Sequence, residues 1–126
     1  MINRYADIEK GKIIAHLLKG NINGLCSMDQ FIEMSSCLDL IFLSDCKVLI
    51  DIYNKTEELP PNSPNRFIDF EEEISKSIFS SIGRLRANGL ISSRNAAKFS
   101  GVPVNKLDVE SKITEFGILF CKLGLL

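Results

Sequence analysis

The chain has 126 residues, of which 45% are hydrophobic and 25% are charged, and its formal net charge at neutral pH is −1. These values are ordinary for one folded domain and exclude wholesale disorder. The near-zero charge does not indicate a nucleic-acid binder, although a local basic patch on a neutral domain can suffice. No apolar run is long enough for a signal peptide or a membrane span, so we expect a cytoplasmic protein with no membrane partner.

The first half predicts three short helices between residues 6 and 54, with connections short enough for neighbouring helices to pack antiparallel. An apolar stripe at helical spacing runs from Ile8 to Leu18 and leaves lysines on the other side. Gly20 and Gly24, among asparagines, supply the residues that stop this helix and turn the chain.

The second and third helices have start signals of their own. Ser27 and Gln30 have the spacing of a capping box, in which each side chain bonds the other residue's backbone N–H. Ser44 and Asp45 are expected to cap the third helix. The apolar sets of the two helices are Phe31, Met34, Leu38 and Ile41, and then Val48, Leu49, Ile52 and Tyr53.

A proline-rich segment, 56–68, separates this helical part (1–55) from the rest (69–126) of what we expect to be a single domain. It contains three of the four prolines and few apolar residues, so it cannot continue a helix. It is either a surface loop or a hinge between two subdomains.

The second half predicts a long helix, a hairpin and a closing helix. The long helix runs from 69 to 88, and Gly89 stands where a terminating glycine belongs. Residues 90–99 and 106–113 have the pattern of the two arms of a β-hairpin. Thr114 is expected to cap the last helix.

This order, with "GRLRANGLI" leading into the hairpin and "KITEFG" entering the closing helix, resembles the winged-helix superfamily over residues 44–124. The resemblance implies a mainly α fold with a small antiparallel β-hairpin, in which three N-terminal helices pack on a winged-helix-like C-terminal half. The slot before the recognition helix departs from the family pattern, because the proline-rich segment and "RFIDFEEE" fill it. The first half is similar to short uncharacterised proteins of bacteria and phages. The family pattern falls on Arg84, Leu85, Gly89, Leu90, Ile91, Ile113, Thr114 and Gly117.

The charged residues of the second half support opposite predictions about DNA binding. Asp69 and the glutamates at 71–73 would repel a phosphate backbone at the start of the long helix. From Arg84 to Lys106, by contrast, there are five basic residues and no acid. This run is a solvated face, a nucleic-acid contact or a site for an acidic protein partner. Its members are Arg84, Arg86, Arg94, Lys98 and Lys106.

No motif indicates catalysis, a metal or a cofactor. No phosphate-binding loop or nucleophile motif is present, and we expect His16 to be a partly buried structural residue. The cysteines lack the spacing of a zinc site or a disulfide scaffold, which predicts buried, reduced thiols. They are Cys26, Cys37, Cys46 and Cys121.

The apolar C-terminus leaves two alternatives open. Such a tail either closes the core or forms a contact with a second copy or another protein. The interface residues would be Phe120, Leu123, Leu125 and Leu126.

Together these features favour a non-catalytic protein–protein interaction module of winged-helix type. A phage- or mobile-element-encoded modulator of a host protein is one such module. The alternative is a small DNA-binding transcriptional regulator that uses the long helix and the basic wing.

Overall fold

The computed structural model describes residues 4–58, 68–69, 76–95 and 109–126, and it is mainly helical with a small antiparallel sheet, as expected. The closing helical segment changes from α to π geometry at Cys121. In chain order the elements are α1 (Arg4–Ile22), α2 (Met28–Leu40), α3 (Leu43–Glu57), β1 (Ile68–Asp69), α4 (Lys76–Ala87), β2 (Ile91–Asn95), β3 (Val109–Ile113), α5 (Glu115–Phe120) and η1 (Cys121–Leu125).

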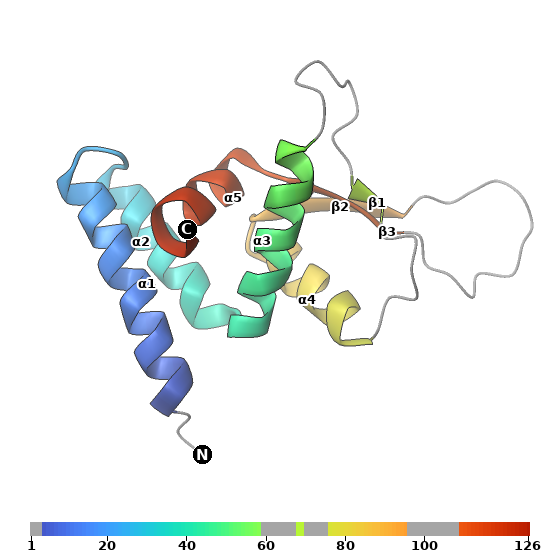
Figure 1. Cartoon of the computed structure of the whole chain (residues 1–126), viewed down its shortest axis with the longest axis horizontal. Coiled ribbons are helices and arrows are strands. Elements are labelled where there is room, and N and C mark those ends of the chain that lie inside the picture. Colours follow the sequence, from blue (N-terminus) through green and yellow to red (C-terminus); the bar gives the residue numbers. More distant parts are fainter. Residues whose placement is uncertain (1–3, 59–67, 70–75, 96–108) are drawn as a thin grey trace, which may run out of the picture.

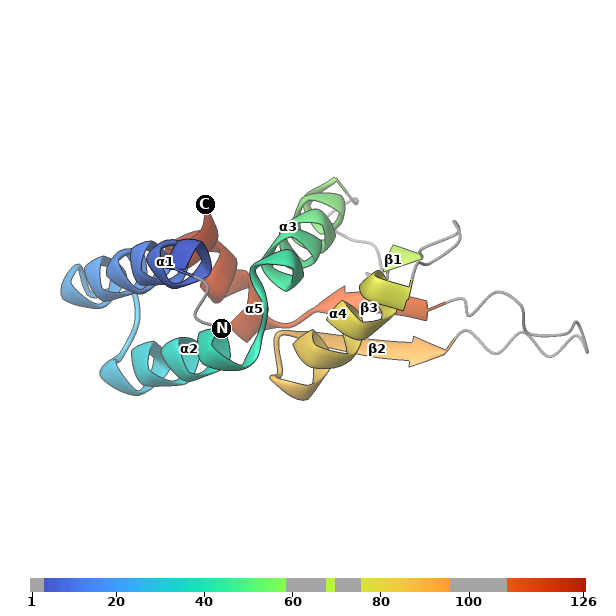
Figure 2. The same ribbon diagram turned by 90° about the horizontal axis from the view of Figure 1, so that it is seen from below.

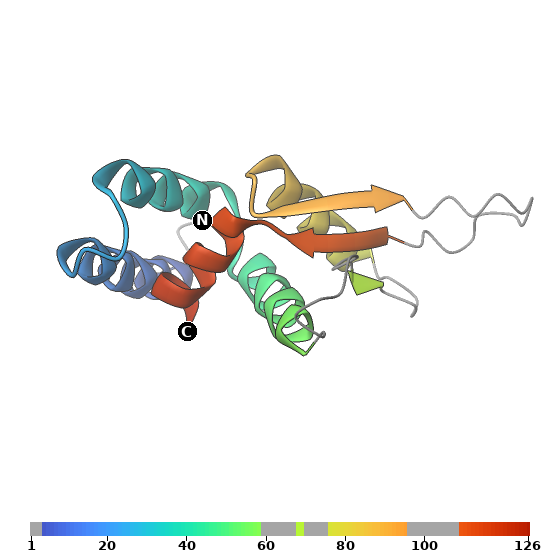
Figure 3. The ribbon, with the colours of Figure 1, turned by 90° about the horizontal axis from the view of Figure 1, so that it is seen from above.

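The N-terminal helices and the sheet occupy opposite ends of the molecule (Figures 1 and 3). α1 and α2 run side by side at one end, and η1 packs against α1 (Figure 2). α3 lies between this helical end and the sheet, where it contacts α4, β3 and η1. It therefore joins the two halves of the fold.

Glycine ends two of the helices through the same hydrogen-bond pattern. Gly24 and Gly89 both have φ of +76°, a conformation that residues with a Cβ rarely adopt. After α4, the Leu90 N–H donates to the Leu85 carbonyl and the Gly89 N–H donates to the Arg86 carbonyl. This is a Schellman motif, and it confirms the terminating role predicted for Gly89.

Two of the predicted helix caps are confirmed, and the third is confirmed for Asp45 but not for Ser44. Ser27 and Gln30 form the expected capping box, and Thr114 accepts a hydrogen bond from the Gly117 N–H at 3.0 Å. The N-cap of α3 is Phe42, two residues before the predicted Ser44, which lies inside the helix, while Asp45 accepts a hydrogen bond from the Phe42 N–H as a capping residue does.

Gly20 was expected to stop the first helix, and this prediction was wrong. It lies within α1 and is buried, and a Cβ there would stand 3.1 Å from the Leu123 side chain. Gly124 faces α1 in the same way, with the Leu17 side chain 3.0 Å from its ideal Cβ position. These two glycines let α1 and η1 approach closely, and that packing outweighs the low helix propensity of Gly20.

The predicted hairpin arms pair as antiparallel strands. Ile91 stands opposite Ile113, and Asn95 stands opposite Val109. Residues 96–108, which include the expected hairpin tip, lie outside the described residues.

A short third strand was not predicted. β1 (Ile68–Asp69) pairs with the other edge of β3, so the strand order is β1-β3-β2. The sequence had placed these residues at the end of the 56–68 loop and at the start of the long helix. The open edge of β3 offers backbone hydrogen bonds that outweigh the local helical pattern. α3 continues to Glu57, and the acidic run at 71–73 lies outside the described residues.

The core joins side chains from the N-terminal helices to the sheet and the closing segment. Apolar residues that are completely buried come from α1, α2, α3, α4 and α5, from the α2–α3 and α4–β2 connections, and from η1. They are Leu17, Met34, Leu38, Leu49, Ile52, Leu85, Phe120, Ile41, Leu90 and Cys121.

We expect Gly117→Ala to lower the free energy of unfolding by at least about 2 kcal/mol, because overpacking forces backbone shifts. The added methyl group would overlap the Leu90 carbonyl oxygen, which accepts a hydrogen bond from the Thr114 N–H. Gly83→Ala is the matched control, since its Cβ would meet nothing within 4 Å. In the middle of α4 it should raise stability by up to about 1 kcal/mol. Equal urea midpoints for the two variants would contradict the packing described.

Candidate interaction site

The structure describes two of the five predicted basic site residues in full. Arg84 lies on α4 with its guanidinium against α3, and Arg86 is exposed near the end of α4. The backbone of Arg94 belongs to β2, and its side chain lies outside the described set. Lys98 and Lys106 fall in the range that is not described. The basic run therefore cannot be assembled into one surface from these residues.

Arg84 is held by a buried carboxylate on α3. The side chain of Asp45 is completely buried and accepts hydrogen bonds from Arg84 Nε at 2.7 Å and Arg84 Nη2 at 2.9 Å. Asp45 also accepts from Ser81 Oγ at 2.6 Å and from the Phe42 N–H at 2.9 Å. One carboxylate thus caps the start of α3 and fastens α3 to α4.

These contacts change the protonation of the carboxyl group. Burial alone would raise the pKa of Asp45, but the hydrogen bonds from Arg84, from the Phe42 N–H and from Ser81, with the charge of Arg84, lower it below its usual value. The hydrogen bond to Asp45 in turn raises the pKa of Arg84. Both groups are therefore charged at neutral pH, and each neutralises the other.

The same contacts fix the guanidinium over an exposed aromatic ring. The Cζ atom of Arg84 lies 4.5 Å from the centroid of the Phe42 ring, within the range of a cation–π contact. Phe42 is 59% exposed, and Leu40, two residues earlier in the chain, is 66% exposed. We call Leu40, Phe42 and Arg84 the junction surface, because they lie at the end of α2, at the N-cap of α3 and on α4.

The geometry of the α2–α3 connection explains why this surface is apolar. Ile41 and Phe42 both have extended backbone conformations, in which successive side chains point to opposite sides. Ile41 is completely buried, so Phe42 is turned outward. Lys10 Nζ donates to the Ile41 carbonyl at 2.8 Å and fixes the connection from α1.

Leu40 and Phe42 were not among the predicted surface residues. Ser44 was predicted as the cap of α3 because Ser is preferred at the N-cap and Phe is not, and this choice concealed the exposed position of Phe42.

The predicted C-terminal interface residues divide between core and surface. Phe120 is completely buried, and Leu123 and Leu125 are partly buried against the core. Leu126 is 61% exposed. Phe120 therefore fits the core alternative, and Leu126 is the member of the set whose side chain is mostly open to contact.

The chemistry-bearing residues elsewhere have structural environments. All four cysteines are free and buried, as predicted, and burial raises the pKa of Cys46 to about 11 and that of Cys121 to about 12. His16 is exposed rather than partly buried, with Nδ1 3.4 Å from the Gly124 carbonyl oxygen. Within the described ranges, no group of three or more His, Cys, Asp and Glu side chains is placed to hold a metal ion.

No family model, curated protein or solved structure matches this chain. No helix in the described part of the chain is long and apolar enough to cross a membrane.

Replacing Asp45 with Asn should lower the free energy of unfolding at neutral pH by about 1–3 kcal/mol, because the buried amide places an NH2 group where the carboxylate accepts hydrogen bonds. The pKa of Asp45 is lower in the folded state, so its stabilising effect is complete above the unfolded value of about 3.9. That effect disappears as the pH falls through the folded-state pKa. Urea unfolding of both proteins from neutral to strongly acidic pH measures this difference.

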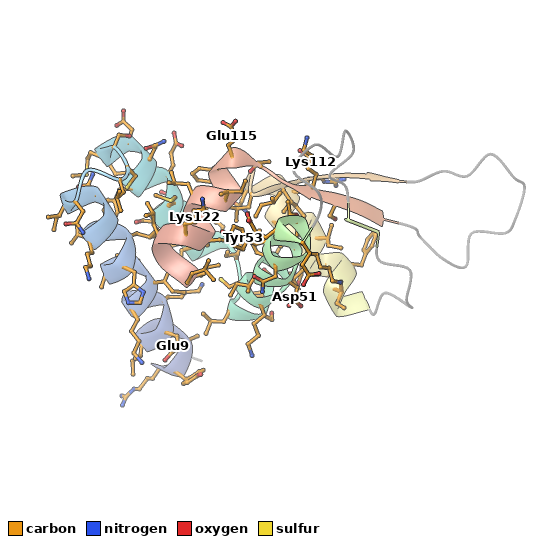
Figure 4. All side chains as sticks on the ribbon, turned by 45° about the horizontal axis from the view of Figure 1, so that its top comes forward. Glu9, Asp51, Tyr53, Lys112, Glu115 and Lys122 are labelled. Atoms are coloured by element: carbon orange, nitrogen blue, oxygen red, sulfur yellow. The ribbon has the colours of Figure 1, made fainter. Side chains whose placement is uncertain are left out.

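Asp51→Asn is the control, since Asp51 is exposed on the same helix (Figure 4). It should change stability by no more than about 0.5 kcal/mol. A difference between wild type and Asp45→Asn that does not shrink at acidic pH would contradict the ion pair.

Proposed function

We propose that this chain is a non-catalytic protein–protein interaction module whose C-terminal half is of winged-helix type. The order of elements supports the winged-helix part. α4 passes through Gly89 into β2, β2 pairs with β3, and Thr114 starts the closing helix. These are the positions on which the resemblance rests.

The junction surface is the observation that carries the interaction role. Exposed aromatic side chains and arginine are the residues most enriched at the energetic centres of protein interfaces. Here Arg84 is already held in one conformation by Asp45, so a partner would not have to order it. Its remaining N–H groups and the Phe42 side chain offer a partner hydrogen-bond donors beside apolar area.

We therefore propose that the partner is a protein. A host protein, bound by a phage- or mobile-element-encoded factor, is one such partner. DNA binding is the second candidate function, since Arg86 and Lys112 are both exposed on the C-terminal half. Arg84 does not add to a phosphate-binding surface, because the charge of Asp45 cancels its own.

A salt series with random-sequence duplex DNA separates the two functions. We expect no binding at micromolar protein even at low salt, since the described part of the basic run is partly neutralised. Micromolar binding that falls steeply with salt and weakens in Arg86→Ala would contradict the proposal and favour a regulator. Lys47→Ala, an exposed lysine on α3, is the charge-matched control.

The interaction role predicts that Phe42→Ser abolishes capture of a specific partner without unfolding the chain. Serine is a preferred N-cap residue, so the loss of the ring contact with Arg84 is offset by a better start for α3. Affinity purification from the native cell, followed by titration of the purified partner, measures the effect. We expect affinity to fall at least about 30-fold, the effect of losing an interface hot spot.

Phe79→Ser is the control, because Phe79 is 47% exposed on α4, outside the junction surface. It should leave partner binding unchanged. Equal affinities for wild type, Phe42→Ser and Leu40→Ser would overturn the assignment of this surface.

A further inference from the structure

A second apolar surface runs along the outer face of α1. Ile8, Gly11, Ala15, Leu18 and Ile22 follow one another at steps of three and four residues. This is the spacing of the a and d positions of a coiled coil, with Ile8, Ala15 and Ile22 at a. We call these five residues the α1 seam.

The α1 seam lies on the opposite side of the helix from the residues that pack into the core. Leu17 and Gly20 are buried against the rest of the chain, whereas Ile8, Leu18 and Ile22 are 59%, 41% and 74% exposed. α1 forms one edge of the molecule (Figure 1), and side chains along it extend away from the other elements (Figure 4). A helix that is apolar on both faces normally has both faces covered.

The residues in the middle of the seam are small. Gly11 and Ala15 are both exposed, and a Cβ at Gly11 would meet nothing within 4 Å. A second helix could therefore approach α1 closely at its centre while Ile8 and Ile22 pack at either end. The helix is already formed on the core, so docking against it would not require a coil to fold first.

The charged residues beside the α1 seam favour a second copy of this chain as the occupant, with the two α1 helices parallel. Asp7 occupies a g position, and Lys12 and Lys19 occupy e positions. In a parallel pair of α1 helices, each Asp7 lies beside Lys12 of the other copy, which gives two attractive contacts. An antiparallel pair would instead place Lys12 beside Lys19 of the other copy, twice, and like charges there repel.

We infer that the α1 seam binds a second copy of this chain, with the two α1 helices parallel around a two-fold axis. Lys12 forms an ion pair with Glu9 of its own helix at 3.1 Å, but its side chain is 64% exposed there. Such an exposed pair is worth little, so Lys12 can exchange it for Asp7 of the second copy. The seam does not overlap the junction surface, so a dimer would present two junction surfaces to partners.

Sedimentation velocity of the full chain over about 1 to 200 μM tests the association, the range expected for an interface smaller than a standard one. The wild type should pass from monomer to dimer across this range. Ala15→Glu keeps a good helix former but places two like charges on the dimer axis, so it should stay monomeric with an unchanged helical spectrum. Leu40→Ser, an exposed apolar change outside the seam, should dimerise like the wild type.

Cysteine cross-linking tests the orientation, and the four native cysteines are buried. In a parallel dimer, each of the variants Ile8→Cys and Ile22→Cys should form, under mild oxidation, a disulfide between the same position of its two protomers. An antiparallel dimer would cross-link only a mixture of the two variants, which would overturn the proposed orientation.

Exchanging the charges of Asp7 and Lys12 tests the predicted contact between the two copies independently. Asp7→Lys and Lys12→Asp should each weaken the dimer several-fold, and the double exchange should restore it. A wild type that is monomeric at every concentration would overturn the inference, and so would a dimer that Ala15→Glu leaves intact. Neither result bears on the proposed partner role, because Phe42→Ser tests that role at a surface that Ala15→Glu does not touch.

Discussion

The ion pair between Asp45 and Arg84 is the interaction on which the rest of the structure depends. It crosses from α3, which joins α1 and η1 to the sheet, to α4, which packs on α3 and β2. Replacing both members of such an ion pair by apolar residues often changes the free energy of unfolding little, whereas removing one member leaves the other without a counter-charge. The pair therefore selects one arrangement of the two helices more than it adds net stability. Because Asp45 also binds the Phe42 N–H, the same arrangement sets where the exposed ring lies.

Local features of the fold could be predicted from the sequence because their causes are local. The Ser27 capping box, the Gly89 terminus and the pairing of β2 with β3 each depend on residues close together in the chain or on a period of two. β1 could not be predicted, since two residues have no period and their pairing is decided by the open edge of β3. Gly20 was misread because its close packing against η1 involves a residue about a hundred positions away.

The candidate site was partly predictable for the same reason. Arg84 was identified from the basic run, and Asp45 from its position near a helix start. That the two residues bind each other could not be inferred, because 39 positions separate them and no pattern links them. Their pairing turns Arg84 from a candidate phosphate contact into the fixed part of an apolar and aromatic surface. The junction surface and the α1 seam are two separate surfaces, which we propose for a partner and for a second copy respectively.

The most direct measurement is NMR of the arginine Nε–H groups as the pH is lowered. We expect the Nε–H of Arg84 to exchange slowly with water at neutral pH, unlike that of the exposed Arg4. This protection should be lost once Asp45 is protonated, at a pH below the usual range of a carboxyl group. An Arg84 signal that exchanges as fast as that of Arg4 at neutral pH would contradict the pair, and with it the junction surface.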